Sequence, residues 1–214
     1  MLTSPNPGEG KSITLANLAV VMAQSGMKVI LVDTDLRRPV QHKIFSLANR
    51  HGFVDAILSP KHELAQHLQR TAVEHLWLLS SGSLPPNPAE LLASERMKEL
   101  IDALEQDADL VLFDSPPALV VTDAAILGTR VDGVVLVNDV GRTRSNDARR
   151  SVDELKRVRV NLLGVVLNRL TLKGSGYYYS YYYEGKAERK HRKSRKSWLE
   201  RRFPWLYPPN NKTR

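Results

Sequence analysis

The chain has 214 residues, a net charge of +8, no cysteine and an apolar fraction of 42%. This composition is typical of a globular protein with one core, and it excludes disulfides and thiolate metal sites. No apolar run approaches the roughly 20 residues of a membrane-spanning helix. Residues 186–202 alone hold nine Lys or Arg and two Glu, so most of the positive charge lies in this segment. The rest of the chain is therefore not a basic nucleic-acid-binding domain.

Short apolar runs alternate with helix-length stretches between residues 11 and 168. The runs are rich in Val, Leu and Ile, which predicts strands buried on both faces, and they cover 29–33, 76–80, 110–114, 133–137 and 162–168. Helices are predicted over 12–25, 89–106 and 145–158. This alternation predicts a three-layer α/β fold, with a mostly parallel sheet and helices on both faces.

The first motif in the chain, PNPGEGKS at residues 5–12, ends like a phosphate-binding loop. Its glycines let backbone amides surround phosphate groups, Lys11 adds a positive charge, and the Ser12 hydroxyl can bind Mg²⁺. Pro5 stands where the strict pattern has its first glycine. The alternative is a glycine-rich turn before a helix.

Carboxylates follow two of the predicted strands. Asp33 closes the run at 29–33 and Asp35 follows two residues later, while Asp114 closes the run at 110–114. The carboxyl ends of parallel strands meet at one edge of a sheet, so these groups can hold Mg²⁺ or accept a proton from an attacking hydroxyl. The alternative for each is a turn residue or helix cap. Arg37 and Arg38 follow and are candidate phosphate contacts, and an exposed basic turn is the alternative for Arg38.

The pattern of strands and helices stops after residue 172. Residues 174–214 are predicted to be a disordered tail, which divides the chain into segments 1–173, 174–185 and 186–214. Six of the seven tyrosines gather in this tail, at Tyr177, Tyr178, Tyr179, Tyr181, Tyr182 and Tyr183. Such a segment is typical of a phosphorylation substrate, and an aromatic platform for single-stranded nucleic acid is the alternative.

Together these motifs resemble the cytoplasmic kinase domain of the bacterial tyrosine kinases of capsule and exopolysaccharide synthesis. That family carries a Walker A loop ending PGxGKS, a Walker A′ motif of apolar residues and DxDxR, a Walker B motif ending DxxP, a PPNPxELL segment and a tyrosine cluster. The matching segments are 7–12, 29–37, 110–117, 85–92 and 177–183. The resemblance covers residues 1 to about 185.

The resemblance implies an ATP-dependent protein-tyrosine kinase that uses ATP and Mg²⁺ and phosphorylates its own tyrosine cluster. Asp33 is then the proton acceptor, Lys11 and Arg37 are catalytic, and Asp35 and Asp114 join Ser12 at Mg²⁺. Asn168 resembles a residue that contacts adenine, and a strand-end turn residue is its alternative. The remaining nucleotide contacts implied are Pro7, Gly8, Glu9, Gly10, Lys11, Ser12 and Ile13.

The resemblance also implies partners. These are a membrane polysaccharide co-polymerase that activates the kinase, other copies in a ring, and a cognate tyrosine phosphatase. The implied role is control of polysaccharide chain length and export, in the cytoplasm or at the inner face of the plasma membrane. The basic and aromatic residues of 186–214 suit an anionic membrane surface, with a solvated tail or a nucleic-acid contact as alternatives.

Three features depart from the family: the first four residues, the basic and aromatic segment that follows the tyrosine cluster, and Ile13. Residues 1–4 are too short for the strand and helix that precede the loop in relatives, so the central strand is expected to be missing. A fragment, a misassigned start or a strand from another polypeptide would explain this, and weak activity is expected. Ile13 replaces a frequent Thr. By contrast, Asn6 stands where MinD- and ParA-type ATPases have a signature Lys, which argues against that group and for the kinases. An ATPase switch of that type and an inactive remnant are the alternative functions.

Overall fold

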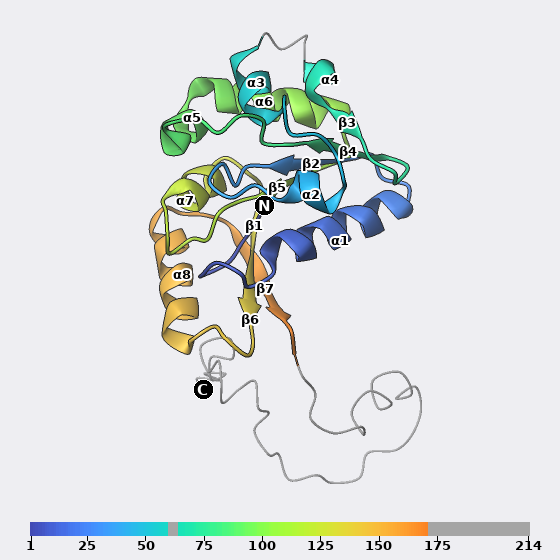
Figure 1. Ribbon diagram of the computed structural model, residues 1–214. Helices are drawn as coiled ribbons and strands as arrows, with labels where there is room; N and C mark the ends of the chain where they lie inside the picture. The colour runs from blue at the N-terminus through green and yellow to red at the C-terminus, as the bar shows by residue number, and fades with distance from the viewer. Residues whose placement is uncertain (60–63, 171–214) are drawn as a thin grey trace, which may run out of the picture. The chain divides into compact units, whose positions relative to one another are not determined.

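The computed structural model describes residues 1–59 and 64–170. They form a seven-stranded sheet in the order β3-β4-β2-β5-β1-β6-β7, which Figure 1 shows running through the middle of the fold. Among the described strands, β3 and β4 pair antiparallel and all other neighbours are parallel. The strands are β1 (Leu2–Thr3), β2 (Val29–Asp33), β3 (Gln69–Arg70), β4 (Leu76–Leu79), β5 (Leu110–Asp114), β6 (Val134–Asp139) and β7 (Leu162–Asn168).

Helices cover both faces of the sheet. The helix α1 packs over β2 and β5 on one face, whereas α7 and α8 lie on the other (Figure 1). This arrangement confirms the predicted three-layer α/β fold. The helices are α1 (Lys11–Gln24), α2 (Gln41–Ile44), α3 (Phe53–Leu58), α4 (Leu64–His67), α5 (Pro88–Ala93), α6 (Glu95–Asp107), α7 (Asp123–Gly128) and α8 (Ser145–Arg157). None of those in the described part combines the length and apolarity needed to cross a bilayer.

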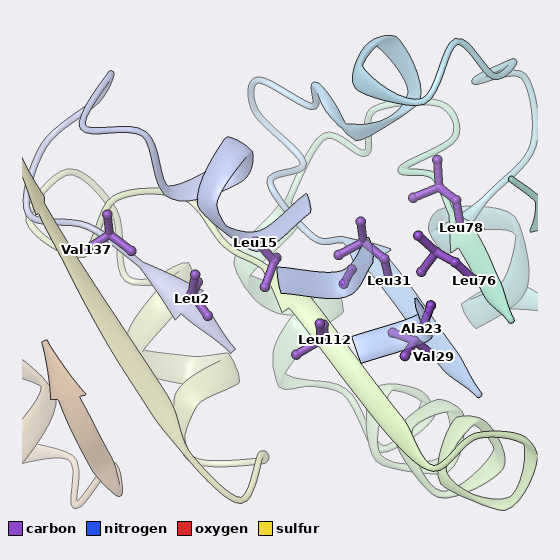
Figure 2. Packing of buried hydrophobic residues seen from close by; sticks show 10 residues of the cluster. Leu2, Leu15, Ala23, Val29, Leu31, Leu76, Leu78, Leu112 and Val137 are labelled. Atoms are coloured by element: carbon purple, nitrogen blue, oxygen red, sulfur yellow. The ribbon is translucent and has the colours of Figure 1, made fainter. Parts of the chain in front are cut away.

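The core lies between α1 and the sheet. Leu15, Ala19 and Ala23 recur at a four-residue spacing, so they share one helix face, and all three are buried. Figure 2 shows Leu15 directed at the strands that carry Leu31 and Leu112. Burial of a leucine side chain stabilises a fold by about 1.5–3 kcal/mol. This packing fixes α1, and with it the loop that precedes α1.

The prediction of a single helix over 89–106 is wrong, because the structure has two helices there. Ser94 separates α5 from α6, with backbone angles of φ −67° and ψ 157°. Its hydroxyl accepts a hydrogen bond from the Met97 amide at 3.3 Å, which caps the second helix. Serine favours this capping position over a helix interior, so the chain turns where apolar periodicity alone predicts continuity.

The prediction that the central strand is missing is also wrong. Leu2 is paired in parallel with Asp114 of β5 and Val135 of β6, and it is buried. The amide of Ala118 donates to the Ser4 carbonyl at 2.8 Å, which continues the attachment beyond the strand. Leu2 is thus paired on both sides, and Thr3 pairs with Leu136 of β6. The phosphate-binding loop is therefore anchored in the middle of the sheet.

Candidate nucleotide and magnesium site

The phosphate loop (residues 5–12) joins β1 to α1 and turns on two glycines. Gly8 has φ +78° and Gly10 has φ +94°, a region that L-residues rarely adopt. Gly10 is also crowded, since the Nδ2 atom of Asn168 donates to the Glu9 carbonyl at 2.9 Å. A Cβ atom on Gly10 would lie 2.1 Å from that Nδ2 atom. Glycine is thus required here both by backbone conformation and by space.

The side chain of Glu9 holds the phosphate loop to the segment between β6 and α8. One carboxylate oxygen accepts from the Thr143 hydroxyl at 2.7 Å, and the other accepts from the Asn6 amide at 3.1 Å. Burial raises the pKa of Glu9, although these hydrogen bonds oppose the shift. The Asn6 side chain donates to Asp147 at 3.3 Å. Sequence reasoning missed Thr143 and Asp147, since nothing local marks them as loop contacts.

Arg169 makes a second attachment to the phosphate loop. Its Nη1 atom donates to the Gly8 carbonyl at 3.0 Å and to Asp139 at 2.7 Å. The side-chain amide of the neighbouring Asn168 donates a hydrogen bond to the Glu9 carbonyl, so Asn168 lies against the phosphate loop. The adenine contact of Asn168 stays a prediction.

Three of the predicted metal ligands converge on the ammonium group of Lys11. The Lys11 Nζ atom lies 2.9 Å from Asp35, 3.2 Å from Asp114 and 3.1 Å from the Ser12 hydroxyl. Burial lowers the pKa of Lys11, but the charges of Asp114 and Asp35 outweigh it and hold the pKa above its ordinary value. Burial raises the pKa of Asp114 above its ordinary value, although the charge of Lys11 opposes the shift. The sequence prediction that these groups come together is consistent with this geometry.

These three oxygens fit Mg²⁺ chemically. Mg²⁺ prefers oxygen donors and is commonly held by one or two carboxylates together with substrate phosphates and water. Two carboxylates and one hydroxyl already surround a single cationic group here. Within residues 1–59 and 64–170 there is no cluster of three or more His, Cys, Asp or Glu side chains for a metal. The arrangement therefore suits a magnesium ion that is shared with a nucleotide.

Asp33 occupies a different environment from Asp35. It is fully buried, and its carboxylate accepts backbone hydrogen bonds from Asp35 at 3.3 Å, Val40 at 3.0 Å and Gln41 at 2.9 Å. Burial, and next the charge of Asp114, raise the pKa of Asp33 to about 7. Asp33 is not among the residues that line the cleft beside Lys11. Its predicted role as proton acceptor stays a prediction and requires residues 34–41 to move.

Gln41 connects the strand ends and was missed by sequence reasoning. Its Nε2 atom donates to Asp114 at 2.8 Å and to the Ser12 carbonyl at 3.1 Å. Its backbone amide is one of the three that bind Asp33. A glutamine eight residues beyond a strand carries no sequence signal of its own, so only the fold reveals this contact.

A cleft of about 460 Å³ opens beside Lys11. Lys11, Ser12 and Asp35 form its polar end, and an apolar wall follows from Ile13, Val40, Pro116, Pro117, Val120 and Val121. Arg37 and Arg38 line the rim. Asp123 holds Arg37 through two hydrogen bonds of 2.9 and 3.1 Å, so this guanidinium is fixed at the cleft. Pro7, Gly8, Gly10 and Arg169 complete the lining.

The tyrosine cluster at 177–183 and the basic segment 186–214 lie outside the described residues. Their predicted roles as phosphate acceptor and membrane contact stay predictions.

Curated relatives of this chain are protein kinases. A family model described as ParA, NUBPL iron-transfer P-loop NTPase, matches residues 1–201. The tyrosine-protein kinase YwqD of Bacillus subtilis is 48% identical over 168 residues, which are 78% of this chain and 70% of that protein. The putative tyrosine-protein kinase CapB of Staphylococcus aureus is 37% identical over 85% of this chain and 79% of its own length.

Solved structures agree with this placement. The chimerical protein CapA2B2 matches with a TM-score of 0.75 and 38% identity, over 79% of this chain and 74% of that one. The kinase domain of Escherichia coli tyrosine kinase Etk matches with a TM-score of 0.77 and 35% identity, over 82% and 68%. MinD of Pyrococcus horikoshii, at 22% identity and a TM-score of 0.63, shares the fold. The chain therefore belongs to the bacterial tyrosine-protein kinases, a family with the P-loop NTPase fold.

Proposed function

We propose that this chain is an ATP-dependent protein-tyrosine kinase whose first substrate is its own tyrosine cluster. The observation that carries the proposal is the convergence of Ser12, Asp35 and Asp114 on Lys11, within 3.2 Å, at the polar end of the cleft. The names of YwqD and CapB support the tyrosine specificity. The proposed acceptors are Tyr177, Tyr178, Tyr179, Tyr181, Tyr182 and Tyr183.

Phosphoryl transfer depends mostly on positioning and charge. We assign phosphate binding to the backbone amides of the phosphate loop and to Lys11, which must leave its present carboxylate partners to reach the nucleotide. Ser12, Asp35 and Asp114 would then hold Mg²⁺, which neutralises charge on the phosphates. Arg37, fixed by Asp123 at the rim, would add positive charge beside the transferred group.

In the proposed reaction the tyrosine oxygen forms a bond to the γ-phosphorus. The bond between that phosphorus and the β–γ bridging oxygen breaks, and ADP leaves. The phenolic proton passes to a carboxylate, for which Asp33 is the proposed acceptor. A pKa of about 7 suits a group that must bind and release a proton near neutral pH. Residues 34–41 would have to open first, because Asp33 is fully buried.

The apolar wall of the cleft supports an aromatic acceptor. Pro116 and Pro117 are rigid, and Ile13 and Val120 expose apolar surface beside the polar end. An apolar wall next to a phosphate site suits a tyrosine ring, whose body is apolar and whose hydroxyl is polar. We propose that the tyrosines of one copy enter the cleft of another, as the family resemblance implies.

The cellular role proposed here rests on the motif resemblance. It is regulation of capsular or exopolysaccharide chain length and export, with a membrane co-polymerase as activator and a tyrosine phosphatase that reverses the modification. Segment 186–214 is proposed to contact anionic membranes. Sedimentation with liposomes containing anionic lipid, with and without that segment, tests this contact, and equal sedimentation of both chains would contradict it.

The test of the kinase proposal uses purified protein, γ-labelled ATP and Mg²⁺. Wild type should label itself on tyrosine, and Lys11→Met should not. Lys28→Met is the matched control, because Lys28 lies over the Trp77 ring, 5.6 Å from its centroid, and does not line the cleft. Phosphotyrosine that persists in Lys11→Met, with no other kinase present, would contradict the proposal.

A mixing experiment addresses transfer between copies. Lys11→Met keeps its tyrosines, whereas a variant with phenylalanine at all six positions keeps its catalytic site. Label on Lys11→Met in the mixture indicates transfer in trans. Release of free phosphate without tyrosine labelling by wild type would instead indicate the ParA- or MinD-type switch, and absence of ATP binding would indicate the inactive remnant.

A further inference from the structure

Gln41 touches two of the three groups that converge on Lys11. Its Nε2 atom donates to the Oδ2 atom of Asp114, and the other oxygen of that carboxylate faces Lys11. The same Nε2 atom donates to the main-chain carbonyl of Ser12, whose hydroxyl is the third oxygen near Lys11. One side-chain amide therefore orients a carboxylate and a serine at the same time.

The position of Gln41 is itself fixed. The residue is fully buried, and its backbone amide donates to Asp33 at 2.9 Å. The orientation of the side-chain amide is also determined, because the Ser12 carbonyl that it contacts can only accept. A rotated amide would place its own oxygen against that carbonyl.

Fold stability alone does not account for a glutamine here. The Oε1 atom of Gln41 is buried and has no hydrogen-bond partner among the described residues. A buried amide oxygen without a donor destabilises a fold. Methionine has nearly the same shape and would avoid that penalty, but it would leave Asp114 Oδ2 and the Ser12 carbonyl without this donor. The amide is thus explained by what its Nε2 atom holds in place.

We infer that Gln41 is a positioning residue for magnesium binding. By holding Asp114 Oδ2 and the Ser12 carbonyl, it directs Asp114 Oδ1 and the Ser12 hydroxyl toward the ion. This inference rests on the proposed function only in requiring that the chain binds a magnesium nucleotide. Partners of this kind, outside the ligands themselves, orient the ligands of a metal.

Gln41→Met tests the inference, with Gln69→Met as its matched control. Gln69 also donates two hydrogen bonds from Nε2, to Ala48 and Ser80, but it does not line the cleft. ADP binding is measured by calorimetry across a Mg²⁺ series and in EDTA. For Gln41→Met, the half-saturating Mg²⁺ concentration should rise about 10-fold or more. Its affinity for ADP in EDTA should stay unchanged, and Gln69→Met should match wild type in both.

Two outcomes would overturn the inference. One is a Mg²⁺ dependence in Gln41→Met that equals wild type, and the other is an equal loss of ADP affinity in EDTA, which indicates a structural role. If Gln41→Met does not fold, the shorter Gln41→Asn decides, because it keeps an amide but withdraws it from Asp114. Failure of both to fold also overturns the inference. A wild type whose ADP binding ignores Mg²⁺ would count against the proposed function instead.

Discussion

Replacement of Gly10 by alanine should destabilise the fold through two separate effects. The residue has φ +94°, and an L-residue in the left-handed region costs about 1–2 kcal/mol. The new Cβ would also lie 2.1 Å from Asn168 Nδ2. Asn168 must then move and give up its 2.9 Å hydrogen bond to Glu9, a loss of about 0.5–1.5 kcal/mol. The total is about 1.5–3.5 kcal/mol of unfolding free energy.

Gly26→Ala separates the two effects. Gly26 follows the end of α1 with φ +95°, and apart from its chain neighbours no atom of the described residues lies within 4 Å of the place that a Cβ would take. This change should therefore cost only the conformational part, about 1–2 kcal/mol. Urea unfolding without nucleotide measures both variants, so that effects on ligand binding do not enter.

The double variant Gly10→Ala with Asn168→Ala completes the test. Without the Asn168 side chain, the cost of Gly10→Ala should fall to that of Gly26→Ala. If Gly10→Ala costs no more than Gly26→Ala, or costs the same with and without Asn168, the steric argument is refuted.

Three further predictions concern pH, an ion pair and the core. Burial raises the pKa of Asp33 from 3.8 in the unfolded chain to about 7 in the folded protein. The folded state therefore binds this proton more tightly, which stabilises it fully below about pH 4, and the stabilisation is lost as the pH rises through about 7. The melting temperature should fall over that range and Asp33→Asn should flatten the curve, whereas a rise would contradict the assignment. Arg37→Ala leaves the buried Asp123 carboxylate without its ion-pair partner. It should lower the free energy of unfolding, measured in urea, by about 1–2 kcal/mol, a value kept small because the arginine side chain is 43% exposed. An unchanged free energy of unfolding would contradict this, because water would then replace the guanidinium at Asp123. Leu15→Ala should cost about 2–5 kcal/mol, while Leu18→Ala, 38% exposed, should stay within about 0.5 kcal/mol, and equal losses would refute the packing described.

The long strands and α1 were predictable because their signals are local. The runs at 29–33 and 110–114 are continuous and apolar, and these two strands have the predicted bounds. The two-residue strand β1 was not predictable, because its pairing depends on β5 and β6 rather than on its own composition. Ser94 similarly separates α5 from α6 by capping the second helix, a contact that the spacing of apolar residues does not reveal.

The same distinction applies to the site. The motifs indicate Lys11, Ser12, Asp35 and Asp114, and these side chains lie together in the structure. Gln41 was not predictable, since its function depends on a contact across the sheet. The motif also did not indicate that Asp33 faces backbone amides instead of the cleft, because alternation along one strand does not determine how the following loop folds over it.

The attachments of the phosphate loop have a consequence for the order of folding. The bonds of Glu9 to Thr143 and Asn168 span 134 and 159 residues, and that of Gly8 to Arg169 spans 161. Contacts so distant in sequence form late, and domains fold as units during synthesis. The phosphate loop is therefore completed by residues that leave the ribosome more than a hundred positions after it. The nascent chain therefore completes the attachments of its phosphate loop only after β7 has emerged.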